Sequence, residues 1–249
     1  MKLLEGKVAV VTGGSRDIGR AISLKLASEG AKVCINYNHN EGKALETLQM
    51  VKDAGGEAFL FKADVTKAEE VSAMLAETAA RYGGKIDILV NNAGGIMGRK
   101  TIEEQDENWY RTVLDLNFKS CWLCTRDVLK YMDKGSIVNI SSQAARDGGG
   151  AGSSIYACGK AAMLCHTRAM AKELGPRGIR VNAVCPGTIE TPIMKVWTQE
   201  QIDGLTARIP VGRLGQPEDI AQAVVFLAAD ENDFITGEAI SVNGGMYCG

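Results

Sequence analysis

Short apolar runs rich in valine and isoleucine alternate along the chain with longer segments in which apolar residues recur at helical spacing. The runs are almost continuously apolar, which is typical of strands buried on both faces of a parallel sheet. The pattern predicts strands at residues 7–12, 32–37, 57–66, 86–92, 135–142, 179–186 and 238–245. Helices are predicted between them, among others at 41–55, 67–83, 116–132, 154–174 and 218–230. This alternation predicts an α/β fold, a doubly wound parallel sheet of about seven strands with helices on both faces.

Length and charge narrow the functional classes. A chain of 249 residues has a size at which α/β proteins commonly form one unit, so we expect a single domain over residues 1–249. The formal charge is -2 and basic residues do not cluster, which argues against a nucleic-acid partner. No segment reaches the roughly 20 apolar residues of a membrane span, and the first residues lack the apolar stretch of a signal peptide. We therefore expect a cytoplasmic protein with no membrane partner.

The cysteines fit a reducing compartment. There are seven, an odd number spread over the chain, which argues against a disulfide framework. Cys121 and Cys124 form a CxxC pair without a second pair, on the predicted amphipathic helix over 116–132. We expect both thiols to pack inside and expect no metal site. Cys158 is likewise expected to be a small packed residue.

Three glycines, Gly13, Gly14 and Gly19, follow the first predicted strand and open the first helix. In this position backbone N–H groups and the positive end of a helix can hold a pyrophosphate. The same glycines are equally consistent with a tight turn that binds nothing, so the turn alone is a weak signal.

Tyr156 and Lys160 are four residues apart on a predicted helix and therefore share a face. A free tyrosine titrates at about pH 10, whereas a neighbouring ammonium favours the phenolate. An isolated pair of this kind is usually only an aromatic side chain beside a surface lysine. Here, however, Ser141 and Ser142 and the asparagine-rich segment 91–95 end two strands at the same edge of the predicted sheet.

Together these features resemble the short-chain dehydrogenase/reductase family over the whole chain, and are similar to its 3-oxoacyl-acyl-carrier-protein reductases. The resemblance rests on the turn from Thr12 to Gly19, "ADV" ending at Val65, "NNAG" at 91–94, Asn117, "SS" at 141–142, "YxxxK" at 156–160, "PG" at 186–187 and the closing "ITGEAISVNGG". It implies an enzyme with a Rossmann-type fold, a nicotinamide dinucleotide and a homotetramer built on the helices through Asn117 and Tyr156.

The resemblance also implies a role for each catalytic position. Tyr156 would exchange a proton with the oxygen of a small-molecule carbonyl or alcohol substrate while hydride passes to or from the nicotinamide. Ser142 would hydrogen-bond that oxygen. Lys160 would hold the nicotinamide ribose and lower the pKa of Tyr156, and Asn117 would help to hold a water molecule. The interval from Ser142 to Tyr156 is one residue longer than usual in the family, which leaves Ser141 as an alternative.

The cofactor site follows from the same resemblance. Asp64 and Val65 would contact adenine, the segment 91–94 would line the adenosine ribose and nicotinamide side, and Thr188 would anchor the carboxamide. The full set expected to bind the dinucleotide is Gly13, Ser15, Arg16, Ile18, Gly19, Asn36, Tyr37, Asn38, Asp64, Val65, Asn91, Ala93, Gly94, Tyr156, Lys160, Pro186, Gly187 and Thr188.

Asp17 stands where the family usually has glycine. A carboxylate about 5 Å from the pyrophosphate would cost roughly 3 kcal/mol at an effective dielectric of about 20. We favour the alternative that Asp17 lies in the first helical turn with its side chain turned away, where it complements the helix dipole. Its candidate partners are then Arg16, Arg20 and Arg146.

The expected cofactor is NADP (NADPH) in preference to NAD. Enzymes specific for NAD carry an acidic residue at the end of the second strand, which binds the ribose 2'-hydroxyl. This strand ends in Asn36, Tyr37, Asn38 and His39, with no carboxylate before Glu41. Arg16 lies in the glycine turn, where a guanidinium suits a 2'-phosphate.

The substrate is not identified by any residue. We expect a substrate-binding lid over residues 188–215, beyond the sixth strand. It mixes apolar Ile193, Met194, Val196 and Trp197 with Lys195 and Arg208, which suits a largely apolar carbonyl compound or a lid that packs on itself. The alternative to an enzyme is a non-catalytic dinucleotide sensor or scaffold on the same fold.

Overall fold

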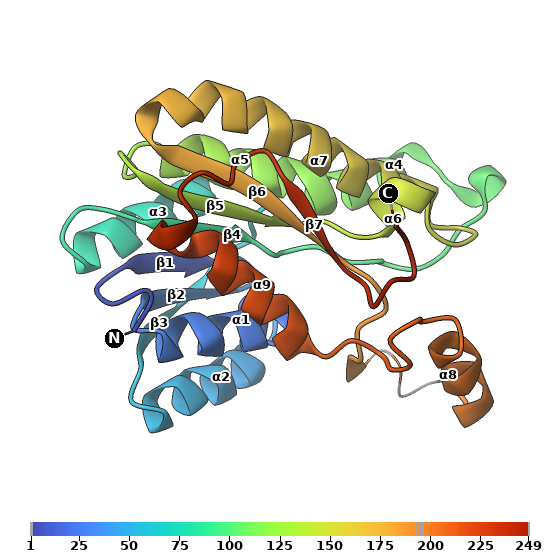
Figure 1. Cartoon of the computed structure of the whole chain (residues 1–249). Helices are drawn as coiled ribbons and strands as arrows, with labels where there is room; N and C mark the ends of the chain where they lie inside the picture. The colour runs from blue at the N-terminus through green and yellow to red at the C-terminus, as the bar shows by residue number, and fades with distance from the viewer. Residues whose placement is uncertain (1, 193, 195–196, 249) are drawn as a thin grey trace.

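The computed structural model describes residues 2–192, 194 and 197–248, and its described strands form one parallel sheet (Figure 1). The sheet has seven strands in the order β3-β2-β1-β4-β5-β6-β7. They are β1 (Val8–Val11), β2 (Lys32–Tyr37), β3 (Glu57–Lys62), β4 (Ile88–Asn91), β5 (Gly135–Ile140), β6 (Ile179–Pro186) and β7 (Ala239–Val242). The predicted doubly wound α/β fold is confirmed, although β3 ends at Lys62 and not at 66.

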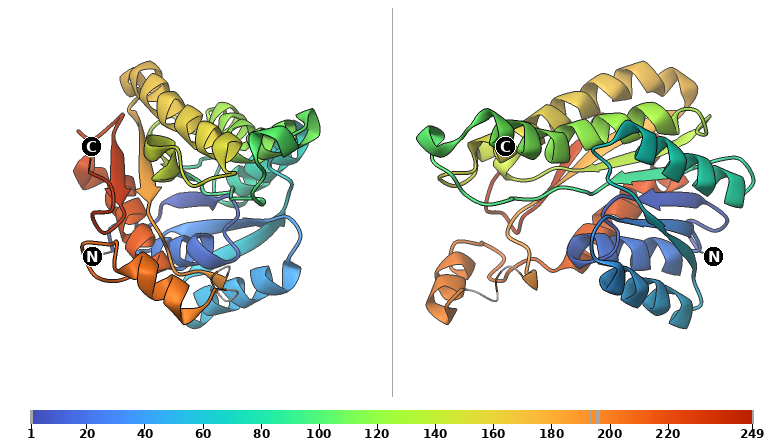
Figure 2. Two further views of the ribbon diagram at one scale, coloured as in Figure 1. Left: turned by 90° about the vertical axis from the view of Figure 1, so that its right-hand side faces the viewer. Right: turned by 180° about the vertical axis from the view of Figure 1, so that it is seen from behind.

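Helices cover both faces of this sheet (Figures 1 and 2). The α-helices of the described residues are α1 (Asp17–Ser28), α2 (Glu41–Asp53), α3 (Ala68–Arg81), α4 (Glu107–Leu114), α5 (Ser120–Val128), α6 (Ala144–Asp147), α7 (Ser154–Leu174), α8 (Gln199–Thr206) and α9 (Pro217–Ala228). In Figure 1, α1, α2 and α9 lie below the sheet, and α3, α4, α5 and α7 lie above it.

The burial of the strands on both faces explains why their sequences are continuously apolar. In β1, Ala9 and Val11 belong to the core shared with α1 and α9, whereas Val8 and Val10 belong to the core shared with α3 and α5. Successive side chains of a strand point to opposite faces, so each face of a doubly covered sheet requires apolar residues. The apolar residues of β1 therefore do not alternate with polar ones.

The predicted helix over 116–132 is part of a longer helical segment. It begins with α4 at Glu107, continues through a π-helical turn over Asp115–Lys119 and ends with α5 at Val128. A π-helical turn holds one extra residue within a helix and is frequent at functional sites. Here it carries Asn117, a buried residue whose side chain reaches the sheet edge described below.

The strand order reverses between β1 and β4. The chain leaves β1 towards β2 and β3 on one side, then crosses over to β4 on the other. In open α/β sheets the ligand crevice lies beyond the carboxyl ends of the strands at such a point. The glycine turn after β1 and the "NNAG" segment after β4 both lie there.

Candidate active site

The turn between β1 and α1 leaves no room for side chains at two of its glycines. Gly13 has a left-handed φ of +60°, and a Cβ at this residue would lie 3.2 Å from the Cα of Ala93. A Cβ at Gly19 would overlap the carbonyl oxygen of Gly13. Only glycine allows the helix and the turn to approach so closely. A bare turn of this shape at a helix N-terminus fits the pyrophosphate of a dinucleotide.

Two other predicted residues of this turn are fixed by the body of the protein. Ser15 is buried, and its carbonyl oxygen accepts a hydrogen bond of 2.7 Å from the Thr47 hydroxyl on α2. Ile18 packs against the core beneath α1. The turn is therefore held to α2 and to the sheet core.

Asp17 is the first residue of α1, as expected, but its backbone is left-handed with φ +51°. Among the described residues it is the one non-glycine with a positive φ. L-residues rarely adopt this conformation, which is the physical reason for glycine at this position. The Asp17 carboxylate lies 3.1 Å from the guanidinium of Arg16, whereas Arg20 pairs with Glu46. The expected ion pair with Arg16 is thus present.

At the end of β2 the side chains of two predicted cofactor residues are held by the protein itself. Asn36 is buried; its Oδ1 accepts a hydrogen bond of 3.0 Å from the Gly13 N–H, and its Nδ2 donates one of 3.0 Å to the Ala63 carbonyl. The hydroxyl of Tyr37 lies 3.3 Å from a carboxylate oxygen of Glu41. Asn36 therefore positions the glycine turn. The side chain of the third predicted residue, Asn38, is half-buried.

Asp64 and Val65 follow β3, as the sequence predicts. Val65 is buried. Burial favours the neutral form of the Asp64 carboxyl, but hydrogen bonds from the N–H and hydroxyl of Thr66, at 3.0 and 2.7 Å, lower its pKa below the ordinary value. Asp64 is thereby kept ionised and fixed at this edge of the sheet.

The end of β4 is tied to the glycine turn by two residues, Thr12 and Asn92, whose hydrogen bonds the sequence did not indicate. Asn92 Nδ2 donates hydrogen bonds to the carbonyls of Thr12 and Gly13, at 2.9 and 3.1 Å. The Thr12 hydroxyl accepts from the N–H groups of Asn92 and Ala93, both at 2.9 Å. An asparagine beside a glycine usually signals only a turn, so nothing in the sequence distinguished Asn92 from its neighbours.

Asn91, predicted to line the cofactor, directs its amide into the protein. Its Nδ2 donates to Asn139 Oδ1 on β5 at 2.8 Å and to the Thr125 hydroxyl on α5 at 3.2 Å. Asn139 donates in turn to the Thr167 hydroxyl on α7 at 2.9 Å. These buried hydrogen bonds link β4 and β5 to the helices above them.

Asn117, Gly94 and Lys160 meet at the carboxyl edge of β4 and β5. Asn117 Oδ1 accepts a hydrogen bond of 2.9 Å from the Gly95 N–H, and its Nδ2 donates to the Val113 carbonyl at 2.9 Å. A Cβ at Gly94 would lie 2.8 Å from Lys160 Nζ and 2.9 Å from Asn117 Oδ1. Only a bare backbone fits between these two side chains.

Replacing Gly94 by alanine is therefore expected to lower turnover by about tenfold or more and to destabilise the protein by about 1–3 kcal/mol, as overpacking does. The added methyl must displace the Lys160 amine or the Asn117 amide. Initial rates and urea unfolding would measure the two effects. Gly55→Ala is a matched control, because Gly55 also has a positive φ, of +74°, but open space around it. An equal loss of activity in both variants would contradict the proposed crowding.

Lys160 and Tyr156 lie on the same side of α7. Lys160 Nζ is 6.0 Å from the centre of the Tyr156 ring and donates a hydrogen bond of 2.8 Å to the Ile140 carbonyl at the end of β5. The Lys160 side chain is buried, and this burial lowers the pKa of its amine to about 8. The expected pairing of the two residues on one helix face is what the structure shows.

Ser142 is the serine that contacts the tyrosine. Its side chain is near enough to the Tyr156 hydroxyl to act on the pKa of that phenol, and its Oγ accepts a hydrogen bond of 3.1 Å from the Ala144 N–H. The Ser141 hydroxyl instead donates to the Lys160 carbonyl at 2.9 Å. Burial raises the pKa of Tyr156, and the hydrogen bond from Ser142 acts in the opposite direction without reversing it. The expected lowering of this pKa by Lys160 is therefore wrong for the structure as it stands.

The segment after β6 closes the other side of the crevice. Pro186 is the last residue of β6, and the Gly187 N–H donates to the Val242 carbonyl at 3.0 Å. A Cβ at Gly187 would lie 2.6 Å from the Asn243 Cβ, so glycine is needed here as well. The Thr188 carbonyl accepts a hydrogen bond of 3.0 Å from the Gly215 N–H. These contacts hold the two ends of the predicted lid, residues 188–215, next to each other.

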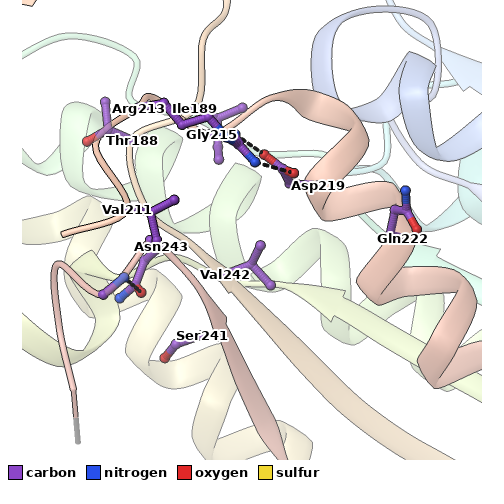
Figure 3. Close-up of a pocket in the computed structure, with 12 residues that line it drawn as sticks. Thr188, Ile189, Val211, Arg213, Gly215, Asp219, Gln222, Ser241, Val242 and Asn243 are labelled. Atoms are coloured by element: carbon purple, nitrogen blue, oxygen red, sulfur yellow. Dashed lines mark hydrogen bonds and ion pairs between the residues drawn. The ribbon is translucent and has the colours of Figure 1, made fainter. Parts of the chain in front are cut away.

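Two hollows border this segment. The first, of about 410 Å³, lies between the ends of the lid, α9 and β7, and holds the ion pair of Arg213 with Asp219 (Figure 3). The second, of about 310 Å³, lies on the lid and is lined by Trp197, Gln201, Gly204, Leu205 and Arg208. In the right-hand view of Figure 2, α8 stands apart from the sheet and its helices. Of the lid residues named from the sequence, Ile193, Lys195 and Val196 lie outside the described residues.

The cysteines of the chain occupy both buried and exposed positions. Cys121 and Cys124 are buried in α5, as predicted, whereas Cys158 is exposed on α7, so the prediction for it was wrong. Within the described residues, no three acidic, histidine or cysteine side chains come together as metal ligands.

None of the described helices combines the length and the apolar character needed to cross a membrane.

Comparisons with known proteins identify the family of the chain. The sequence model of a family described as Enoyl-(Acyl carrier protein) reductase matches residues 13–247. The chain is 39% identical over 244 residues to the 3-oxoacyl-[acyl-carrier-protein] reductase FabG of Staphylococcus aureus, covering 97% of this chain and 98% of the relative. It is 42% identical over 247 residues to the enzyme of the same name from Vibrio cholerae, covering 98% of each.

Solved structures match the fold over nearly the whole chain. A short-chain dehydrogenase/reductase from Serratia marcescens aligns with a TM-score of 0.92 at 36% identity, covering 98% of this chain and 99% of that one. A structure titled NADH-dependent reductase A1-R', responsible for alginate metabolism, aligns with a TM-score of 0.90 at 33% identity over the full length of both chains. With the sheet order and the residues at its carboxyl edge, these matches show that the chain is an oxidoreductase of the short-chain dehydrogenase/reductase family.

Proposed function

We propose that this chain is a carbonyl reductase or alcohol dehydrogenase that transfers a hydride between NADP and a carbonyl or secondary alcohol. One observation carries the proposal: the buried Lys160 amine lies 6.0 Å from the centre of the Tyr156 ring on the same side of α7, and Ser142 is near enough to the Tyr156 hydroxyl to affect its pKa. A proton donor, a second hydrogen-bonding hydroxyl and a cation are thus gathered beyond the strand ends, where α/β enzymes bind their ligands.

In this proposal each side chain has a separate task. A bound nicotinamide supplies or accepts the hydride. The Tyr156 hydroxyl gives its proton to the carbonyl oxygen during reduction and takes it back during oxidation. The Ser142 hydroxyl bonds the same oxygen and fixes the distance to Tyr156. Lys160 holds the nicotinamide ribose, and Asn117 helps to hold the water that returns a proton.

The residues at the carboxyl edge fit a dinucleotide. The bare turn from Gly13 to Gly19 suits the pyrophosphate, because a Cβ at either end would meet backbone atoms. Asp64 and Val65 would contact adenine, Asn91 to Gly94 would border the ribose and nicotinamide, and Pro186, Gly187 and Thr188 would border the carboxamide. For Asn36, Tyr37 and Asn91 we propose that they shape the site through the hydrogen bonds described above.

The preference for NADP rests on the position of Arg16. Its side chain is exposed at the glycine turn, and no carboxylate ends β2 to bind a ribose 2'-hydroxyl. The nearest acidic residue, Glu41, is engaged by the Tyr37 hydroxyl. A guanidinium can bind a 2'-phosphate through two hydrogen bonds. One structural relative is titled NADH-dependent, so the preference requires a direct measurement.

Replacing Arg16 by alanine is expected to lower the ratio of kcat/KM with NADPH to that with NADH by about tenfold, because a charge-assisted contact to the 2'-phosphate is lost. The measurement compares initial rates with both cofactors. Arg81→Ala on α3 is a control for the loss of one exposed arginine. Unchanged use of NADPH by the Arg16 variant would remove this residue from the role.

The reaction itself is tested with a substrate panel followed at the nicotinamide absorbance. The panel holds a 3-oxoacyl thioester, apolar ketones and a 2-enoyl thioester, since the family description names enoyl reduction and the curated relatives are named for 3-oxoacyl reduction. We expect turnover of carbonyl compounds. Binding of NADPH without turnover of any member would favour the non-catalytic sensor or scaffold.

We further propose a cytoplasmic homotetramer that uses α5 and α7 for assembly. The cysteines are all free thiols, as expected in a reducing compartment. The outer side of α5 exposes the ring of Trp122, which an interface would cover. Sedimentation at micromolar concentration tests the assembly state.

A further inference from the structure

Arg16 is not an isolated cation at the mouth of the glycine turn. Its Nη1 lies 3.1 Å from Asp17 Oδ2, and the two residues are adjacent in the chain. The Arg16 side chain is 67% exposed and that of Asp17 is 26% exposed, so the carboxylate is the more confined partner. Asp17 thus places a fixed negative charge next to the group proposed to bind a 2'-phosphate.

The backbone makes this carboxylate a lasting part of the turn. Asp17 has a left-handed φ of +51° and is the first residue of α1, so it joins the glycine turn to the helix. The Arg16 carbonyl accepts the first hydrogen bond of that helix, from the Arg20 N–H at 3.0 Å. The helix start thus fixes the backbone of both residues. Their side chains therefore remain neighbours, within reach of the ion pair.

We infer that Asp17 is a specificity-determining residue: by pairing with Arg16 it weakens the binding of ligands that carry a 2'-phosphate more than the binding of ligands that lack one. This inference rests on the proposed function, in which Arg16 binds the 2'-phosphate. A dianionic phosphate must share the guanidinium with the carboxylate and also meets its negative charge. A ligand with only a 2'-hydroxyl does not compete with the carboxylate for the guanidinium.

Asparagine is the informative replacement for Asp17. It removes the charge, keeps the size of the side chain and tolerates a left-handed backbone, so the turn is retained. Alanine would confound the loss of charge with backbone strain. Glycine, the usual residue of the family, is the second variant, because it removes the charge and relaxes the backbone at once.

Calorimetric titration of the full chain measures the effect without catalysis. The probes are adenosine 2',5'-bisphosphate and adenosine 5'-monophosphate, which differ only in the 2'-phosphate, followed by NADPH and NADH. We expect Asp17→Asn to tighten the bisphosphate by about fivefold and the monophosphate by less than about twofold, as suits an exposed ion pair. Asp17→Gly should act in the same direction.

Combining Asp17→Asn with Arg16→Ala tests the coupling. If the carboxylate acts through Arg16, the gain is lost in the double variant. Glu77→Gln on α3 removes one exposed paired carboxylate elsewhere and controls for net charge. If Asp17→Asn raises the affinity for both probes equally, or for neither, the inference is overturned. The proposed function still stands in that case, provided that the native chain binds NADPH. Failure of the native chain to bind either dinucleotide overturns both.

Discussion

Replacing Tyr156 by phenylalanine is expected to lower kcat by about a thousandfold, within the range that a positioned acid contributes. The change removes the phenol oxygen near Ser142 and keeps the aromatic ring of this α7 residue. The phenol is the proposed proton donor, so the substrate oxygen loses it. Rates with the best substrate of the panel, at saturating NADPH, measure the loss.

The loss has to be separated from damage to the fold or to cofactor binding. Thermal unfolding and titration with NADPH should give values close to those of the native chain, since the cofactor contacts of the glycine turn are untouched. Tyr110→Phe, on the exposed side of α4, is the matched control, because it removes a phenol oxygen away from the site. Turnover of the Tyr156 variant within about tenfold of the native rate would rule out the phenol as the acid.

The raised pKa of Tyr156 determines the protonation state of the proposed acid. Burial keeps the phenol protonated over the neutral range, against the smaller opposite effect of Ser142. A protonated phenol is the form that reduction requires, whereas oxidation of an alcohol requires the phenolate. At neutral pH Tyr156 is therefore held in the form that can donate a proton.

The fold was predictable because burial on both faces of the sheet leaves a direct trace in the sequence. Val8 and Val10 face one layer of helices, and Ala9 and Val11 face the other, so the strand had to be apolar throughout. The catalytic pair was predictable for a similar reason. A spacing of four on a helix places two side chains on one face whatever the tertiary context.

The features that could not be predicted depend on interactions that leave no pattern among neighbouring residues of the sequence. The hydrogen bonds of Asn36 to the glycine turn were not predictable, because its partners Gly13 and Ala63 follow the neighbouring strands β1 and β3. The left-handed φ of Asp17 is imposed by the turn around it, and the sequence showed only that a glycine was replaced. Burial of Tyr156 raises its pKa against the expected effect of Lys160, because desolvation depends on everything packed around the phenol.

Replacing Lys160 by methionine is expected to abolish measurable turnover and, at pH 7, to stabilise the fold by about 2 kcal/mol. The amine is fully buried, and its pKa falls from 10.5 to about 8. That shift corresponds to about 3 kcal/mol of unfavourable burial of the charged form. The hydrogen bond to the Ile140 carbonyl offsets about 1 kcal/mol of it, and methionine fills a similar volume without a charge.

The pH dependence identifies the cause. Because the pKa is lower in the folded protein than in the unfolded chain, the unfolded chain binds more protons between pH 8 and 10.5. The native protein must therefore gain stability as the pH rises through this window, and the methionine variant lacks this gain. Its advantage is complete below about pH 8 and disappears above about pH 10.5. Urea unfolding at pH 7 and pH 10.5 measures the difference between the two proteins.

Lys172→Met is the matched control, since Lys172 is exposed on the same helix and its loss should change neither turnover nor the pH dependence. A Lys160 variant that is less stable than the native chain at pH 7 would contradict the burial cost, and one that turns over normally would contradict the catalytic role. A buried cation that destabilises the fold is retained only where its charge is used. The energetic cost of Lys160 and its place beside Tyr156 thus support the same conclusion, that this edge of the sheet is built for proton and hydride transfer.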